Sequence, residues 1–147
     1  MLSMDQFIQV CREKGLNVTY QRMIIYKYLM QSKEHPTAED IYRRVKEEYP
    51  SISLATVYKT LETLAEHEVI TKVTALHDLA RYDADTSPHH HLVCTHCRRV
   101  MDIYDEELNQ LPINLDNIKD FKVQRYRIEF EGICAACEAV IKQKQRA

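Results

Sequence analysis

Two cysteine pairs with Cys-x-x-Cys spacing have the residue types and separation of a metal site. A Cys-x-x-Cys on a tight turn brings both sulfurs within reach of one ion, and two such turns complete the tetrahedron of thiolates typical of structural zinc. A rubredoxin-like iron site, a redox dithiol and disulfides use the same residues, but we place structural zinc ahead of them. The predicted zinc ligands are Cys94, Cys97, Cys134 and Cys137.

The residues around these pairs refine the prediction. Arg98 and Glu138 follow the second cysteine of each pair, where glycine is usual. His96 lies inside the first pair, and because four thiolates already fill the site we interpret it as an exposed turn residue. The fifth cysteine, Cys11, lies in an amphipathic stretch and is expected to be a small buried hydrophobe.

A second set of metal-type residues contains no sulfur. It consists of three consecutive histidines, His89-His90-His91, flanked by Asp83 and Asp102. Strand alternation would put His89 and His91 on one face and His90 on the other. Nitrogen and oxygen ligands favour iron(II) or manganese(II). A solvated turn before a half-exposed strand is the alternative, and for either aspartate alone we would prefer it.

The elements expected before this cluster are mostly helical. Apolar spacing and capping residues predict helices over 3–14, from 20 onward, over 37–49 and over 53–66. Two short strands, 69–73 and 79–82, follow around a polar turn at His77-Asp78. Helices followed by a β-hairpin predict a winged helix-turn-helix domain over residues 1–82.

A polar, turn-rich linker is predicted over 83–88, and a small α/β domain over 89–147. In that domain we expect strands at 89–93 and 99–103, a short helix at 105–110, the longest strand at 123–130 and a terminal helix at 135–144. A domain this small needs a stabilising cross-link in addition to its core, and a bound zinc ion would provide one. The predicted fold class is therefore α+β, with a winged-helix domain before a zinc-stapled α/β domain.

Composition restricts the function only weakly. The chain has 147 residues and a net charge of −2, so an overall basic character does not point to nucleic acid, although one basic face would suffice. No apolar run approaches the roughly 20 residues of a membrane span. The first residues lack the pattern of a signal peptide, so we expect a cytoplasmic protein with reduced cysteines.

Three sequence segments together with the cysteine pairs resemble the ferric uptake regulator family, and within it the peroxide sensors. They are residues 35–42 (HPTAEDIY), 53–58 (SLATVY) and 89–94 (HHHLVC). The resemblance covers nearly the whole chain. It implies a DNA-binding domain, a dimerisation domain, and a homodimer that binds AT-rich inverted repeats of double-stranded DNA when loaded with metal.

The resemblance also implies a regulatory iron or manganese site, which brings in a histidine that spacing alone would not join to the cluster. The implied ligands are His35, Asp83, His89, His91 and Asp102. Iron sensors of the family usually have glutamate where this chain has Asp102. In peroxide sensors, the histidines that gain oxygen match His35 and His89. A further family site would use His90 with Glu106 or Glu107, but residues 125–129 lack the histidine that completes it.

The resemblance places the recognition helix at 53–66. There Tyr58 would pack on thymine methyl groups and Lys59 would lie near bases or phosphate. From spacing alone, Tyr58 could equally belong to the core. The complete set of predicted DNA contacts is Lys14, Arg22, Thr56, Tyr58, Lys59 and Lys72.

The predicted function is a metal-dependent repressor, not an enzyme, that senses hydrogen peroxide. An iron-responsive repressor of the same family is the alternative. A metal-dependent hydrolase would need an open coordination position and a cleft, and no nucleophile motif or glycine-rich loop indicates one. A module that binds only zinc is a further alternative, which the binding of a second metal would exclude.

Overall fold

The computed structural model describes residues 1–74, 79–111 and 118–146. These residues form two compact units, Met1–Ser87 and Pro88–Ala147. The division between the units falls within the predicted linker, 83–88. Among the described residues, no helix is long and apolar enough to cross a membrane.

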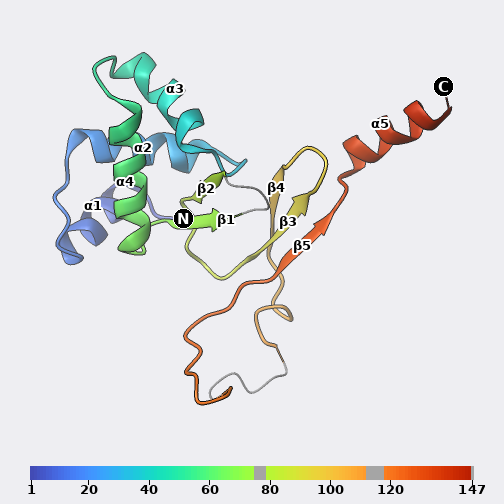
Figure 1. Cartoon of the computed structure of the whole chain (residues 1–147). Coiled ribbons are helices and arrows are strands. Elements are labelled where there is room, and N and C mark those ends of the chain that lie inside the picture. The colour runs from blue at the N-terminus through green and yellow to red at the C-terminus, as the bar shows by residue number, and fades with distance from the viewer. Residues whose placement is uncertain (75–78, 112–117, 147) are drawn as a thin grey trace. The chain divides into compact units, whose positions relative to one another are not determined.

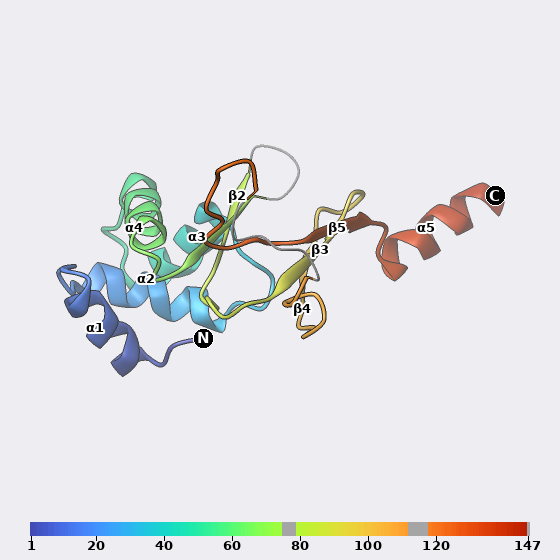
Figure 2. The same ribbon diagram turned by 90° about the horizontal axis from the view of Figure 1, so that it is seen from below.

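The first unit consists of four helices and a two-stranded hairpin (Figure 1). Both views show the helices gathered together with the hairpin at their edge (Figure 2). The predicted helices and hairpin strands are confirmed, with shifted ends, whereas the turn at His77-Asp78 lies outside the described residues. The elements are α1 Met4–Glu13, α2 Tyr20–Gln31, α3 Ala38–Glu48, α4 Leu54–Glu66, β1 Thr71–Thr74 and β2 Ala80–Asp83.

Each of the four helices begins at a serine or threonine whose side chain accepts a hydrogen bond from the first helical turn. These N-caps are Ser3, Thr19, Thr37 and Ser53. The Thr37 cap is reciprocal, because Asp40 also accepts from the Thr37 backbone N–H at 3.0 Å. A cap of this kind stabilises a helix by about 1 kcal/mol. The start of α3, which follows His35 closely, is therefore held in place.

The core of this unit lies between the helices and includes the hairpin. Phe7 of α1 stacks on Tyr26 of α2 with ring centroids 4.0 Å apart. Cys11 is fully buried, as predicted for a small hydrophobe. Tyr82 of β2 is also fully buried, and its hydroxyl donates to Glu62 of α4 at 2.5 Å. This contact ties the hairpin to the predicted recognition helix.

The second unit is built on a three-stranded sheet of order β4-β3-β5. The central strand, β3 (His90–Cys94), pairs antiparallel with β4 (Val100–Ile103) and parallel with β5 (Glu129–Gly132). In this register His91 lies opposite Asp102. Helix α5, Ala135–Arg146, follows β5. The α+β fold class and the terminal helix are confirmed.

Two predictions for the second unit are wrong. Residues 105–110 form turns rather than a helix. The Asp105 carboxylate accepts from the backbone N–H groups of Glu107 and Leu108 as a helix N-cap does, but the Gln110 N–H then bonds the Glu107 carbonyl, three residues back, and the helix does not continue. The strand predicted over 123–130 is confined to 129–132. Next to it, the Ile128 N–H donates to the His90 ring at 3.0 Å, so a side chain takes the bond that a strand ladder would use.

Candidate metal centres and nucleic-acid interface

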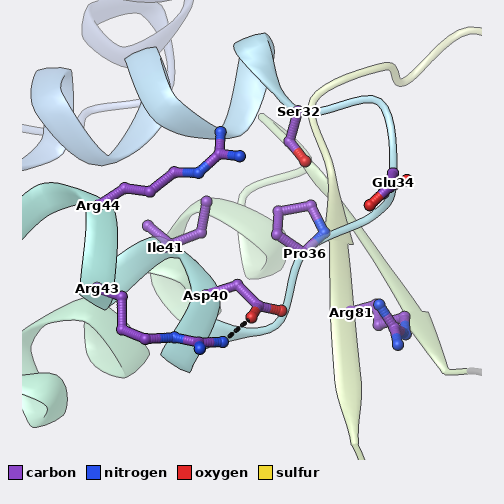
Figure 3. A pocket seen from close by; sticks show the side chains of 8 residues that line it. All are labelled: Ser32, Glu34, Pro36, Asp40, Ile41, Arg43, Arg44 and Arg81. Atoms are coloured by element: carbon purple, nitrogen blue, oxygen red, sulfur yellow. Dashed lines mark hydrogen bonds and ion pairs between the residues drawn. The ribbon is translucent and has the colours of Figure 1, made fainter.

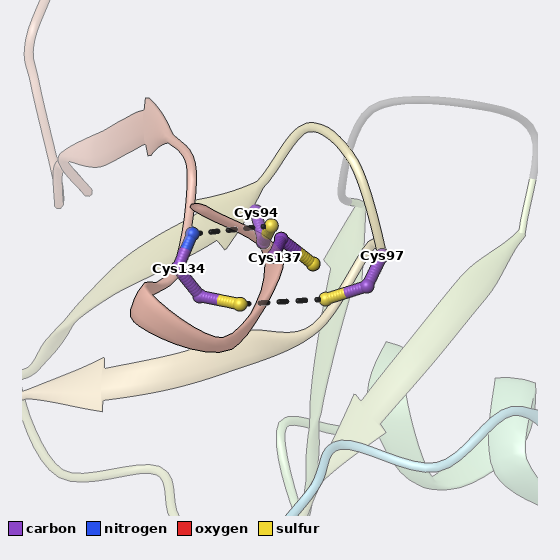
Figure 4. Close-up of side chains that lie close together, drawn as sticks. All are labelled: Cys94, Cys97, Cys134 and Cys137. Carbon is purple, nitrogen blue, oxygen red and sulfur yellow. Dashed lines mark hydrogen bonds between the residues drawn. The ribbon is translucent and has the colours of Figure 1, made fainter. Parts of the chain in front are cut away.

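The four cysteines of the two Cys-x-x-Cys pairs converge on one point of the second unit (Figure 4). Their sulfur atoms all lie within 4.8 Å of one another, and Cys97 and Cys134 are 3.8 Å apart. Tetrahedral zinc with Zn–S bonds of about 2.3 Å requires sulfurs about 3.8 Å apart. A disulfide requires about 2.05 Å, and all four thiols are free. The spacing therefore fits a zinc-type cation.

The protonation of these thiols shows why the cluster suits a cation. Backbone N–H groups, first that of Cys134 and then that of Cys97, lower the pKa of Cys94 to about 5. Burial and the neighbouring sulfurs raise the pKa of Cys137 to about 12. The backbone N–H groups thus favour the thiolate form of Cys94, and a cation between the four sulfurs would offset the burial and the mutual repulsion that oppose ionisation of the others.

The turn that carries the first cysteine pair contains a strained residue. Arg98 has a φ of 61°, in the left-handed region that usually selects glycine. Its backbone N–H donates to the Cys94 carbonyl at 2.8 Å, and this bond closes the turn. The turn geometry is thus kept despite the missing glycine. His96, in the same turn, is exposed, as predicted.

A second group of ligand-type atoms in this unit contains His89, His91 and Asp102. The two Nε2 atoms are 3.1 Å apart, and Asp102 Oδ1 lies 3.5 Å from the first and 3.6 Å from the second. Both histidines are buried, with 8% and 0% of their surface exposed. The register of β3 with β4 positions His91 against Asp102, so the sheet itself brings three nitrogen and oxygen donors together.

The other two predicted ligands, His35 and Asp83, lie in the first unit and contact each other. His35 Nε2 is 3.2 Å from Asp83 Oδ2. His35 is buried, has a φ of 46°, and its carbonyl accepts a hydrogen bond from Arg81 at 2.9 Å. A non-glycine residue in this conformation persists only where its surroundings hold it there. The pair is therefore a fixed two-donor set.

His90, as alternation predicts, does not join His89 and His91. Its Nδ1 accepts from the Ile128 N–H at 3.0 Å, and its ring stacks against Tyr126. Glu106 and Glu107 are exposed in the turn that follows β4. Within the described ranges, these residues belong to no cluster of metal-type ligands. His90 has a structural role in holding the segment before β5.

Sequence reasoning missed one neighbour of the histidine cluster. Tyr104, with 61% of its surface exposed, stacks on the His89 ring with centroids 5.2 Å apart. Strand alternation provided a signal, because residues 102 and 104 share a face when β4 is continued by one residue. Tyr104 therefore covers one face of the His89 ring, and His89 is one of the two histidines for which the family resemblance implies oxidation by peroxide.

The predicted DNA-reading helix α4 exposes the side chains expected of it. Tyr58 is 37% exposed, which excludes the alternative that it belongs to the core, and Lys59 is also exposed. The hydroxyl of Thr56, by contrast, is bonded to that of the N-cap Ser53 at 2.8 Å. The start of α4 therefore presents a tyrosine and a lysine to a partner.

The other predicted DNA contacts lie around this helix. Lys14 is the exposed C-cap residue of α1. Arg22 donates to the Asn17 carbonyl through its guanidinium. On the hairpin, Lys72 forms an ion pair with Glu62 at 2.9 Å. Arg22 and Lys72 therefore have internal bonds that a phosphate group would have to share or replace.

A hollow of about 370 Å³ lies between the segment before α3, α3 itself and the hairpin (Figure 3). Two of its three arginines are already bonded: Arg43 pairs with Asp40, and Arg81 donates to the His35 carbonyl. The residues that line it include no cysteine or histidine. This hollow gives no support to the hydrolase alternative.

Comparison with known proteins identifies the family. Residues 13–131 match the family model described as the ferric uptake regulator family. The chain belongs to this family. The peroxide-responsive repressor PerR of Staphylococcus aureus is 31% identical over 135 residues, which cover 92% of this chain and 91% of that protein.

Solved structures show the same likeness. The peroxide stress regulator of Campylobacter jejuni is 28% identical, with a TM-score of 0.63, and the match covers 93% of this chain and 100% of that one. A zinc-bound manganese uptake regulator is 26% identical, with a TM-score of 0.66, and covers 87% of this chain and 98% of its own. The resemblance found in the sequence is confirmed.

Membership of the ferric uptake regulator family decides between the broad alternatives. Members are transcriptional regulators and not enzymes, which confirms that prediction and excludes the hydrolase. This chain is a metal-responsive repressor that is similar to PerR regulators. Repressors of the family bind DNA and act as dimers.

Proposed function

We propose that this protein represses transcription while metal is bound and releases DNA when hydrogen peroxide oxidises a histidine that holds the metal. The observation that carries the proposal is the sulfur-free group of His89, His91 and Asp102. Its donors favour iron(II) or manganese(II) over zinc. The similarity to PerR regulators points to peroxide as the signal.

The regulatory ion would be held by both units. The second unit would provide three donors and the His35–Asp83 pair of the first unit two more, so that five protein ligands would hold the ion. An ion bound by both sets fixes how the two units are arranged, and with them the recognition helices of the dimer. Metal affinity and DNA affinity are then thermodynamically linked.

The chemistry of the signal depends on which ion is bound. Iron(II) held by these residues would promote cleavage of the O–O bond of hydrogen peroxide, so that one oxygen atom would be added to a ring carbon of a histidine and the other would leave as water. The candidate rings are His35 and His89. The oxidised ring would be a poorer ligand, so the ion and then the DNA would be released. Manganese(II) would fill the site without this reaction. Zinc at the four cysteines is a separate, structural ion.

On DNA, the dimer would place one α4 helix in each half of an AT-rich inverted repeat. Tyr58 would pack on thymine methyl groups, with Lys59 and Thr56 beside it near the start of the helix. Lys14, Arg22 and Lys72 would contact the phosphate backbone. Such contacts fix the register, whereas base contacts supply the sequence preference. The protein would act in the cytoplasm.

The alternative function is an iron-responsive repressor without peroxide chemistry. The residue that bears on the choice is Asp102, because iron sensors of the family usually have the longer glutamate there. A shorter carboxylate changes how the ion is held and therefore how readily peroxide reaches it.

Peptide mass spectrometry tests the proposal. The iron(II)-loaded protein is treated with a low dose of peroxide, with manganese-loaded protein as the control. We expect an added oxygen on peptides containing His35 or His89, with iron only, and loss of DNA binding in parallel. Unmodified peptides with DNA binding retained would support the iron-responsive alternative instead.

A further inference from the structure

The exposed tyrosine of α4 is bonded to an acidic residue of the neighbouring helix. The Tyr58 hydroxyl donates to Glu39 Oε1 at 2.6 Å, a short bond of the kind formed with a charged acceptor. This bond lowers the pKa of Glu39 and raises that of Tyr58. Glu39 is therefore ionised, and Tyr58 is neutral and donates its proton.

A carboxylate at this position needs an explanation, because DNA is negatively charged. An acidic side chain next to the reading helix repels phosphate and weakens binding to any sequence. Within α3, the Thr37–Asp40 capping box stabilises the first turn, and Glu39 adds a hydrogen bond with Thr37. The bond to Tyr58 differs from these contacts because it joins the Glu39 carboxylate to the reading helix.

The backbone of Glu39 is also held in a fixed position. It lies in the first turn of α3, between the capping residues Thr37 and Asp40 and directly after the buried Ala38. The Tyr58 backbone is fixed by α4, so a second anchor at the hydroxyl removes most of the ring's remaining freedom. A ring already held in its binding orientation loses less entropy when it packs against a base.

We propose that Glu39 is a positioning residue that holds the Tyr58 ring in the orientation that reads thymine methyl groups. It acts through Tyr58 and contributes to sequence preference rather than to overall affinity. The inference rests on the proposed function, in which α4 enters the major groove and Tyr58 meets thymine. Thymine differs from uracil only by the C5 methyl group, which is exposed in that groove.

Thymine-to-uracil replacement isolates this role. The manganese-loaded, zinc-replete full chain would first be used to select its preferred duplex from a random pool. Its Kd would then be measured on that duplex and on the same duplex with deoxyuridine in place of thymidine. For the unmodified protein we expect binding about 5- to 20-fold weaker on the uracil duplex, which corresponds to about 1–2 kcal/mol.

Variants then separate the contributions. We expect Glu39→Ala to reduce this ratio to below about 3, even though overall affinity rises as a negative charge is removed. Tyr58→Phe, which keeps the ring but loses the bond, should reduce it similarly. Glu39→Gln keeps an acceptor and should retain most of the ratio. Glu47→Ala removes an exposed charge from the same helix and should leave the ratio unchanged.

The outcomes distinguish the positioning role of Glu39 from the proposed contact of Tyr58 with thymine. If the unmodified protein binds both duplexes equally, Tyr58 does not read thymine methyls, and the proposed base contact fails. If the unmodified protein discriminates but Glu39→Ala discriminates equally well, the positioning role is overturned while the base contact stands. Circular dichroism and zinc content would establish that each variant is folded.

Discussion

The Nε2 atoms of His89 and His91 face each other across 3.1 Å, and both rings are buried. Two imidazole nitrogens at this distance can share one hydrogen, but they cannot both carry one toward each other. Asp102 Oδ1 lies within 3.6 Å of both. A carboxylate and two lone pairs directed at one point form an environment that a divalent cation satisfies better than a proton does.

Replacing one of these rings should therefore abolish tight binding of the regulatory metal. We expect His91→Ala to weaken manganese(II) binding by more than about 100-fold, since loss of an outer-shell partner alone costs about 10–100-fold. Titration calorimetry on zinc-replete protein would measure this change. His96→Ala, at an exposed turn histidine, is the matched control and should bind normally. Normal manganese affinity in His91→Ala would remove this cluster from the site.

Lengthening the carboxylate should separate metal binding from peroxide sensing. We expect Asp102→Glu to keep manganese(II) affinity within about 10-fold, because the same donor type remains. The rate of histidine oxidation in iron-loaded protein should fall by about 10-fold or more, as the ion is held differently. Mass spectrometry over a peroxide time course gives the rate. An unchanged rate would count against the role assigned to Asp102.

The cysteine cluster should be required for the stability of the second unit. Cys137→Ser removes a thiolate ligand, and structural zinc sites of this kind contribute folding energy directly. We expect loss of zinc, exposure of the sheet and dissociation of the dimer. Zinc analysis and analytical ultracentrifugation would show both changes. A Cys137→Ser protein that keeps zinc and remains dimeric contradicts the assignment, whereas Cys11→Ser should retain zinc.

The strained turn at Arg98 offers a stabilising substitution. Because this residue has a φ of 61°, Arg98→Gly should relieve a penalty of roughly 1 kcal/mol. The unfolding midpoint in urea should rise for this variant. Arg99→Gly provides the control, since Arg99 is not among the residues with positive φ, and it should be neutral or destabilising. A lower midpoint for Arg98→Gly would mean that its side chain matters more than its backbone.

The contacts of Glu62 with Lys72 and Tyr82 of the hairpin predict a dependence of stability on pH. The bond from Tyr82, followed by that from Lys72, lowers the pKa of Glu62 in the folded state. Its contribution is therefore fully present above the unfolded pKa of about 4.3 and is lost as pH falls through the lower folded value. We expect Glu62→Gln to be less stable than the unmodified protein at pH 7, with a smaller difference at pH 3. Urea unfolding of both proteins at pH 7 and pH 3 measures this difference in the free energy of unfolding.

The sequence by itself determined the features that depend on local patterns. Capping residues and apolar spacing located the helices, because a helix is stabilised by residues within a turn of one another. Ligand type and spacing identified the four cysteines as one set. Alternation along a single strand separated His90 from His89 and His91. The resemblance of residues 35–42 to the family motif added His35 to the predicted metal ligands.

Only the tertiary structure decided features that depend on partners distant in sequence. The strand predicted over 123–130 shrank to four residues because a strand exists only where a neighbour pairs with it, and the His90 ring takes the bond at Ile128. Tyr58 is exposed and bonded to Glu39 because of how α3 packs beside α4. Such contacts arise from packing, which no local pattern encodes.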